Sequence, residues 1–543
     1  MTAASLLLAT SVLLPLGMAA ACLLPSFRRR VPFLLALAPL PALLVAAVAP
    51  AGTMVFFPAP FRMMLEVDRP GAMLLVGAAL LWSAAGAYAS SYLGSKPGAA
   101  RFSIWWLLTL AGCLGIFVVA DIASFYLLFT LLSLAAYGLI AHEETAGARR
   151  AGGVYVVLAL LGEAFLLLAF VMLATGSPEP NPLIRDVVAG LPLSPMRDGI
   201  VTLLILGFAI KMGLVPVHVW LPLAHPAAPM PASAVLSGVV VKAGVIGLMR
   251  FLPFEAGLPG WGDFLIVAGL VTAFYGAAVG FTQVRSKTVL AYSTVSQMGL
   301  LAVLIGTALG AADSGGLDLV AYYGVHHTLV KGALFLSVGI VAVSGGPRRW
   351  PVLLLTGVLA LSLGGMPLTS GALAKLAAKP MLGSGVVGLA TSLAAAGSTL
   401  LMLHFLRVLW RDAAPATASR APMGEILPWL LVALASLVVP WTLYPSVANE
   451  SLGDLLSIDA LWKLAWPMAL GAIGILGLSR IKSLPGAIPE GDILVLGRRA
   501  LPFGRNWAMW LSEIDGSLRL WPVASLLLIG FAILLGGALI WRT

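Results

Sequence analysis

The sequence predicts an all-α, polytopic membrane protein with about 16 transmembrane helices, and three observations predict this class. Of the 543 residues, 60% are hydrophobic and only 10% are charged, a balance that excludes a soluble globular protein. Apolar runs of about 20 residues, the length that crosses a bilayer, recur along the chain. The basic residues behind the net charge of +10 lie mostly between these runs, which indicates membrane topology rather than nucleic-acid binding.

Each apolar run is bounded by charges, Gly or Pro, and these boundaries define the expected helices. The first run, residues 4–24, has no basic residue before it and is followed by Arg28, Arg29 and Arg30, the reverse of a secretory signal. It is therefore expected to be a retained span. The expected spans are 4–24, 32–50, 70–93, 103–121, 123–141, 151–175, 199–222, 228–252, 262–282, 288–310, 317–343, 351–378, 384–408, 425–445, 459–479 and 519–541.

Charge in the loops predicts how the chain is oriented. If the N-terminus lies outside, the cytoplasmic loops hold roughly three times as many Lys and Arg residues as the opposite loops. We therefore expect a protein of a bacterial inner or plasma membrane, or of an organellar membrane of that type, with its N-terminus outside.

The spans group into four parts. N-terminal helices over 1–102 precede two stretches of five helices, 103–252 and 262–408, and C-terminal helices occupy 409–543. Within the last part, segment 480–518 is rich in Pro and in charged residues, which predicts a cytoplasmic excursion. Its amphipathic end, Trp507 to Leu520, is expected to lie along the membrane surface or along a partner.

Four lysines lie deep inside expected spans: Lys211, Lys242, Lys331 and Lys375. An ammonium at the centre of a bilayer costs a few kcal/mol or more, so such residues usually have a function. A lysine in a poorly solvated site can exchange its proton, which favours a buried relay for protons. The alternative is that each lysine is a static structural pin, paired once.

Two expected spans contain helix breakers at mid-depth. The first break includes Pro216, His218 and Pro222, shortly after Lys211, and the second includes Pro367, before Lys375. Proline frees backbone carbonyls, which at this depth must be buried in protein or line a wet cavity. Each break falls in the fourth helix of a five-helix stretch, and an odd helix number predicts inverted repeats with a transport site between them.

Several segments resemble the antiporter-like subunits of respiratory complex I, of multisubunit sodium/proton antiporters and of membrane-bound hydrogenases. The hydrogenase branch is the most similar. The resemblance covers roughly residues 60–410. It is specific because it rests on several motifs in combination. The motifs are Lys211 to Pro229, Ser233 to Gly244, Ser286 to Gly299 and His326 to Phe335.

The resemblance implies that each five-helix stretch, 103–252 and 262–408, is a half-channel. It also implies roles for the four lysines. Lys211 is similar to the lysine of the first broken helix, and Lys242 to the connecting lysine one helix later. Lys331 is similar to the centre of the second half, and Lys375 to the terminal residue on the second broken helix. The family binds no quinone, flavin or iron–sulfur cluster itself. It works with other membrane and peripheral subunits of complex I-like, hydrogenase-like or antiporter complexes.

The sequence departs from the family at one place. Relatives carry a Trp-Glu or similar pair whose glutamate partners the first lysine, whereas this chain has Phe129-Thr130 there. Glu163, at the centre of the next helix, is about as deep as Thr130. We hypothesise that Glu163 replaces the missing partner of Lys211.

Three histidines are further candidates. His327 precedes Lys331 by four residues and so shares its helical face, and its ordinary pKa suits a proton relay; a core histidine with satisfied hydrogen bonds is the alternative. His218 and His225 flank the first break. Proton entry and hydrogen bonding of freed backbone groups are equally open for them.

These features predict a subunit that moves protons, or sodium and protons, along a midplane relay coupled to a redox partner. The alternatives are a stand-alone cation/proton antiporter and a proton-driven subunit of a complex for solute uptake, such as inorganic carbon. Two cysteines, no His or Cys cluster and no phosphate-binding loop disfavour an enzyme with its own active site, and no cofactor is expected.

Overall fold

A computed structural model describes residues 3–48, 52–56, 62–94, 96–177, 181–413, 421–448, 455, 457–478, 480–481 and 486–495. The chain forms two compact units, 1–490 and 491–543; of the second, only a helical turn over 492–495 is described. Within the described residues, ten helices are long and apolar enough to cross a membrane, and three more apolar helices are shorter. The fold is helical as predicted, but the count of sixteen spans is not confirmed.

The N-terminal part contains one wrong prediction. Residues 32–50 do not form one helix, because Pro32, Pro39 and Pro41 each remove a backbone donor; helix begins only at Leu40. A two-stranded antiparallel sheet, which the sequence analysis missed, follows. The elements are α1 (Ala3–Ala21), α2 (Pro25–Arg28), the 3-10 turn η1 (Val31–Phe33), α3 (Leu40–Val48), β1 (Met54–Phe56), β2 (Met63–Leu65) and α4 (Arg69–Leu93).

The stretch 103–252 contains the five expected helices, and the fourth is broken as predicted. A short helix that was not predicted, α8, lies in the connection before it. The elements are α5 (Ala99–Gly115), α6 (Ile122–Ile140), α7 (Ala146–Ala174), α8 (Ile184–Gly190), η2 (Leu191–Leu193), α9 (Arg197–Met212), α10 (Trp220–Ala227), α11 (Met230–Val235), the π-helical segment η3 (Leu236–Val240) and α12 (Lys242–Phe251).

The stretch 262–408 repeats this order, again with a break in the fourth helix. Its elements are α13 (Pro259–Phe281), α14 (Ser286–Gly310), α15 (Gly316–Val343), η4 (Gly346–Arg348), α16 (Arg349–Gly364), α17 (Ser370–Leu382) and α18 (Val386–Arg411). In both stretches the first helix packs on the second and the third packs on the broken fourth. The inverted relation between the two stretches stays a prediction.

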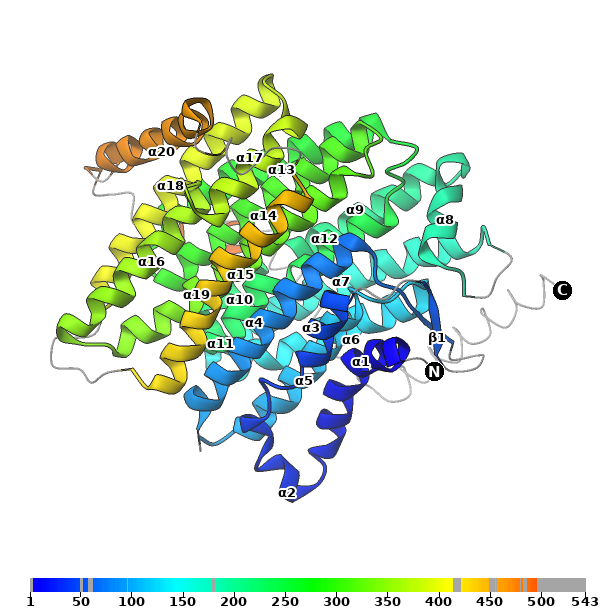
Figure 1. The fold of residues 1–543 in the computed structure, drawn as a ribbon, viewed down its shortest axis with the longest axis horizontal. Helices are drawn as coiled ribbons and strands as arrows, with labels where there is room; N and C mark the ends of the chain where they lie inside the picture. Colours follow the sequence, from blue (N-terminus) through cyan, green and yellow to red (C-terminus); the bar gives the residue numbers. More distant parts are fainter. Residues whose placement is uncertain are drawn as a thin grey trace, which may run out of the picture. The chain divides into compact units, whose positions relative to one another are not determined.

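The C-terminal part begins with α19 (Met423–Leu443), η5 (Tyr444–Ser446) and α20 (Ile458–Leu478). Helix α20 lies at the edge of the bundle and packs mainly on α18 (Figure 1). Few of its residues are buried. The predicted span 519–541 and the stretch Trp507 to Leu520 lie outside the described residues, as does most of segment 480–518.

Helices α14 and α15 form the buried centre of the bundle, and glycines allow α13 to approach α14 closely. A Cβ added at Gly269 would lie 2.5 Å from the carbonyl oxygen of Gly299, and a Cβ at Gly299 would lie equally close to the carbonyl of Gly269. Only glycine fits at both positions. Small residues that let backbones touch are typical of helix pairs in membranes.

Candidate functional site

The first break positions Lys211 in the last turn of α9. Gly213 adopts a left-handed conformation and ends the helix, and its N–H donates to Ala209. The carbonyl of Ile210, which lacks the usual helical donor at Leu214, accepts hydrogen bonds from the indole of Trp220 at 2.8 Å and from the N–H of Gly213 at 3.2 Å. The N–H of Val215 donates to the Thr272 hydroxyl at 3.1 Å. The break is thus satisfied by side chains of the protein interior, as burial in a membrane requires.

Lys211 is buried and is held by hydroxyl groups. Its ammonium donates to Ser133 Oγ at 2.6 Å and to the Tyr155 hydroxyl at 3.3 Å. It also lies 5.1 Å from the centre of the Phe129 ring, a cation–π distance. Ser133 and Tyr155 were not singled out by the sequence, because hydroxyls and tyrosines are common in membrane helices.

Glu163 lies inside the protein, and not toward lipid. Its side chain is 4% exposed, and its Oε2 accepts a hydrogen bond from the Thr130 hydroxyl at 2.7 Å. Thr130 and Ser133 are three residues apart on α6 and therefore share one face. The carboxylate of Glu163 and the ammonium of Lys211 are therefore hydrogen-bonded to neighbouring hydroxyl groups on the same face of α6. No direct ion pair joins them among the described residues.

The π-helical segment η3 leads directly into Lys242. The Thr328 hydroxyl, from α15, donates to the carbonyl of Gly238 in this segment at 2.8 Å. Ser237 shares a 2.6 Å hydrogen bond with Thr294. A single widened turn inside a membrane helix is frequently found at functional sites. It has no sequence signature, so it could not be predicted.

Lys242 and His327 are the two predicted site residues that contact each other directly. The Lys242 ammonium and His327 Nδ1 are hydrogen-bonded, and both side chains are fully buried. The other ring nitrogen, Nε2, has no partner among the described residues. His327 thus links α12 of the first stretch to α15 of the second and leaves one nitrogen unpaired on the face that also carries Lys331.

Lys331 is fully buried between α14 and α15. Its ammonium donates to the carbonyl of Leu290 at 2.8 Å and is hydrogen-bonded to Ser293. One turn before His327, the Tyr323 hydroxyl donates to Gln297 at 2.8 Å. Gln297 in turn donates to Ser398 at 3.0 Å. Polar side chains thus continue from Lys331 toward α18.

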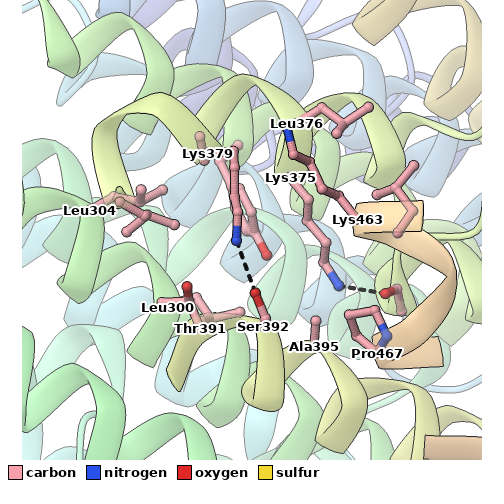
Figure 2. Close-up of a pocket in the computed structure, with 15 residues that line it drawn as sticks. Leu300, Leu304, Lys375, Leu376, Lys379, Thr391, Ser392, Ala395, Lys463 and Pro467 are labelled. Carbon is pink, nitrogen blue, oxygen red and sulfur yellow. Dashed lines mark hydrogen bonds between the residues drawn. The ribbon is translucent and has the colours of Figure 1, made fainter. Parts of the chain in front are cut away.

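The second break holds Lys375 at the start of a cavity. Gly365, with φ of +101°, follows the end of α16, and the ammonium of Lys375 donates to the carbonyl of Gly364 at 2.6 Å. His326 Nδ1 shares a 2.9 Å hydrogen bond with Ser370, the first residue of α17. Unlike the other three lysines, Lys375 is only partly buried, because it lines a cavity between α17, α18 and α20 (Figure 2).

The remaining predicted residues lie in or beside the breaks. His218 is buried, with its ring centre 5.0 Å from that of Tyr275. His225 is buried in α10 against Phe335, and neither of its ring nitrogens has a partner in the part of the chain that the structure describes. The prolines lie at the predicted breaks: Pro216 and Pro367 in the two connecting segments, and Pro222 in the first turn of α10.

Lys287 is a lysine near the first break that the sequence analysis did not single out. Lys287, in the first turn of α14, donates to the carbonyl of Ala228, which ends α10 two residues after Pro226. It therefore reaches the first broken helix close to His225. The structure brings together Lys242 with His327, and Glu163 with Lys211 through α6. It does not bring Lys211 or Lys375 into contact with Lys242 or Lys331.

Comparison with known proteins identifies the family. The model for "NADH:quinone oxidoreductase/Mrp antiporter, TM" matches residues 119–400, just over half of the chain. The matched region contains both broken helices and the four lysines Lys211, Lys242, Lys331 and Lys375. The chain belongs to this family, and the resemblance seen in its motifs is confirmed. It is an integral membrane protein.

Three relatives illustrate the similarity. Hydrogenase-4 component B of Escherichia coli (strain K12) is 30% identical over 302 residues, which cover 52% of this chain and 44% of that protein. A putative antiporter subunit, mnhA2, of Staphylococcus saprophyticus is 32% identical over 333 residues, with coverages of 55% and 40%. The chain thus spans less than half the length of these curated relatives.

The third is a solved structure. A chain of the Mrp complex from Dietzia sp. DQ12-45-1b has a TM-score of 0.74 at 23% identity; the match covers 99% of this chain and 63% of that one. This likeness shows the fold, and it confirms the predicted fold class of an all-helical, antiporter-like membrane protein.

Proposed function

We propose that the protein is a proton-translocating, antiporter-like subunit of a multisubunit membrane complex, with its N-terminus outside and its proton movement coupled to a redox partner. The named relatives, a hydrogenase component and an antiporter subunit, support this class of complex. The observation that carries the proposal is the buried contact between Lys242 and His327, which links the two five-helix stretches.

This contact is suited to moving a proton because one of its two nitrogens must be the acceptor of the hydrogen bond and therefore lacks a proton at that position. A charged ammonium has only donors, and so does a doubly protonated imidazole. The pair therefore holds one proton fewer than its full capacity. That proton can lie on Lys242 or on His327, and Nε2 of His327 has no hydrogen-bond partner among the described residues.

The proposed relay runs from Glu163 and Lys211 through Lys242, His327 and Lys331 to Lys375. Its coupling is electrostatic, since charges interact strongly where the surroundings are poorly solvated. Within this row the lysines outnumber the single carboxylate, so they cannot all be charged at low cost. A proton that arrives at one end therefore favours loss of a proton at the other. Water must bridge the intervals that lack direct contacts.

Isolation of the native complex tests the coupled partner. The complex is purified from its own membrane without a tag on neighbouring subunits, and the proteins that remain bound are identified. A subunit with a flavin or a metal cluster supports redox coupling. Recovery of the chain alone, at full transport activity, contradicts it.

A cation/proton antiporter is the second candidate, and the antiporter subunit among the relatives favours it. The two functions differ in their dependence on sodium and potassium. Proton movement into liposomes that requires no other cation supports a proton relay. An obligatory exchange for sodium or potassium supports the antiporter.

A further inference from the structure

A lysine-lined cavity lies at the Lys375 end of the row of lysines. It is bounded by α14, α17, α18 and α20 and has a volume of about 60 Å³. It shares Lys379 and Lys463 with a neighbouring pocket of about 490 Å³. Lys375 and Lys379 extend into it from α17, and Lys463 reaches it from α20 (Figure 2). The Lys379 ammonium donates to Ser392 of α18 at 3.0 Å. Most of the remaining wall is apolar, including Leu300, Leu304 and Leu464.

The positive charge of this cavity is poorly balanced by the protein. The carboxylate of Asp459 pairs with Lys463 on α20. Neither Lys375 nor Lys379 has a carboxylate partner among the described residues, where their bonds go to a carbonyl and a hydroxyl. The cavity therefore favours an anion with a large apolar part.

The cavity lies beside a helix with exposed apolar side chains. Helix α20 packs on α18 and leaves much of its own surface uncovered, with Trp462 and Ile473 each 66% exposed. Lys463 is 43% exposed, so its ammonium reaches the surface. Lys379 lies one turn from the end of α17, and Lys463 lies in the second turn of α20. This depth suits lysines that meet lipid headgroups.

We infer that the pocket beside this cavity binds one anionic phospholipid, with its phosphate between Lys379 and Lys463 and an acyl chain along the exposed apolar side chains of α20, which include Trp462 and Ile473. Basic pockets between membrane helices bind such headgroups, and acyl chains gain by covering apolar surface. The bound lipid fixes α20 to α17 and places a phosphate next to Lys375. This inference does not depend on the proposed function.

The test measures lipid retained by the native complex. The complex is purified in mild detergent with either the wild-type chain or the double variant Lys379→Gln/Lys463→Gln, and bound phospholipid is counted by native mass spectrometry. Wild type is expected to retain one anionic phospholipid more per chain. In titration with phosphatidylglycerol, the double variant is expected to bind roughly 30-fold more weakly. Each lysine near an anionic headgroup raises the affinity roughly fivefold, and the variant loses two of them.

Two controls separate charge from folding and from unspecific lipid. Lys379→Arg/Lys463→Arg keeps both charges and is expected to retain the lipid, whereas Lys96→Gln, which removes a lysine elsewhere, is expected to match wild type. Equal lipid retention by wild type and by the Gln variant overturns the inference. So does displacement of the lipid by inorganic phosphate alone, because the site would then recognise a free anion and not a lipid.

Discussion

Lys242 and His327 are hydrogen-bonded in the buried centre of the bundle, although 85 residues separate them in the sequence. Lys242 belongs to α12 and His327 to α15, so the contact joins the two five-helix stretches. It is the direct side-chain link between predicted site residues of the two stretches, and the first prediction concerns its proton.

Replacing Lys242 with Arg keeps the positive charge but is expected to abolish proton transfer at this position. A guanidinium does not lose its proton, so His327 would face a permanent donor. We expect Lys242→Arg and Lys242→Met to lower proton transport alike, by roughly tenfold or more. The measurement is the initial rate of proton uptake by liposomes that contain the native complex. Lys96→Arg is the matched control, and a Lys242→Arg variant with wild-type transport refutes the prediction.

The carboxylate near Lys211 is expected to work from either of two helices, from residue 163 of α7 or from residue 130 of α6. Thr130 Oγ1 lies 2.7 Å from Glu163 Oε2, so a glutamate at 130 and a glutamine at 163 would place the charge in nearly the same space. We expect Glu163→Gln to lose most proton transport and Thr130→Glu/Glu163→Gln to regain much of it. Transport in liposomes measures both. Failure of the double variant, with an intact fold, would show that Glu163 acts from α7 alone.

Trp220→Phe is expected to destabilise the first break. The variant leaves the carbonyl of Ile210 without its indole donor, and a hydrogen bond between membrane helices contributes about 0.6 to 1.7 kcal/mol. Thermal unfolding in detergent should therefore begin at a lower temperature than for the wild type. Trp462→Phe, at a position 66% exposed, is the control. Equal unfolding temperatures for both variants would contradict a role of the indole.

Gly269→Ala is expected to separate α13 from α14. The added Cβ would meet backbone of Gly299, which cannot move without a shift of the whole helix. We expect a loss of about 1–3 kcal/mol, as for other overpacked sites. Gly260→Ala in the same helix is the matched control, because no atom lies within 4 Å of its added Cβ. Comparable unfolding temperatures of the two variants would rule out the close approach.

His142, in the connection between α6 and α7, is expected to make stability depend on pH. Burial and the nearby Arg101 lower the pKa of His142 below its ordinary value in the folded protein. Between that lowered pKa and its ordinary value near 6.5, the unfolded chain binds the proton more readily. Stability should therefore fall as pH decreases from about 7 through this window. His142→Gln should show a smaller loss of unfolding temperature over the same range; an identical loss would exclude His142 as the cause.

The sequence predicted those features that depend on the cost of placing a charge or a helix break inside a membrane. Lysines inside apolar runs and prolines at mid-span are detectable without a structure, because both are costly in lipid. Lys211, Lys242 and Lys331 accordingly lie buried, and Pro216 and Pro367 lie in breaks.

The features that could not be predicted are contacts between side chains far apart in the sequence, which depend on how the helices pack. Ser133 and Tyr155 hold Lys211, yet nothing in their local sequence separates them from other hydroxyls. Lys287 has the sequence context of a loop cation, and only the fold brings it to the end of α10. The helix expected over 32–50 does not form in full for a local reason, because the prolines in its first half interrupt helical hydrogen bonding in spite of the apolar sequence.

The widened turn at Leu236–Val240 has a consequence for how the centre of the bundle can move. It holds one residue more than an α-helical turn, and each residue of a helix advances about 100° around the axis. If the extra residue passed to the following turn, Lys242 would swing away from His327 while the ends of the helix stayed in place. We expect that rearrangement of this one turn is sufficient to break the contact between Lys242 and His327, without displacement of whole helices. Deletion of Val239, which removes the extra residue, should leave the fold intact but stop transport; undiminished transport would exclude this motion.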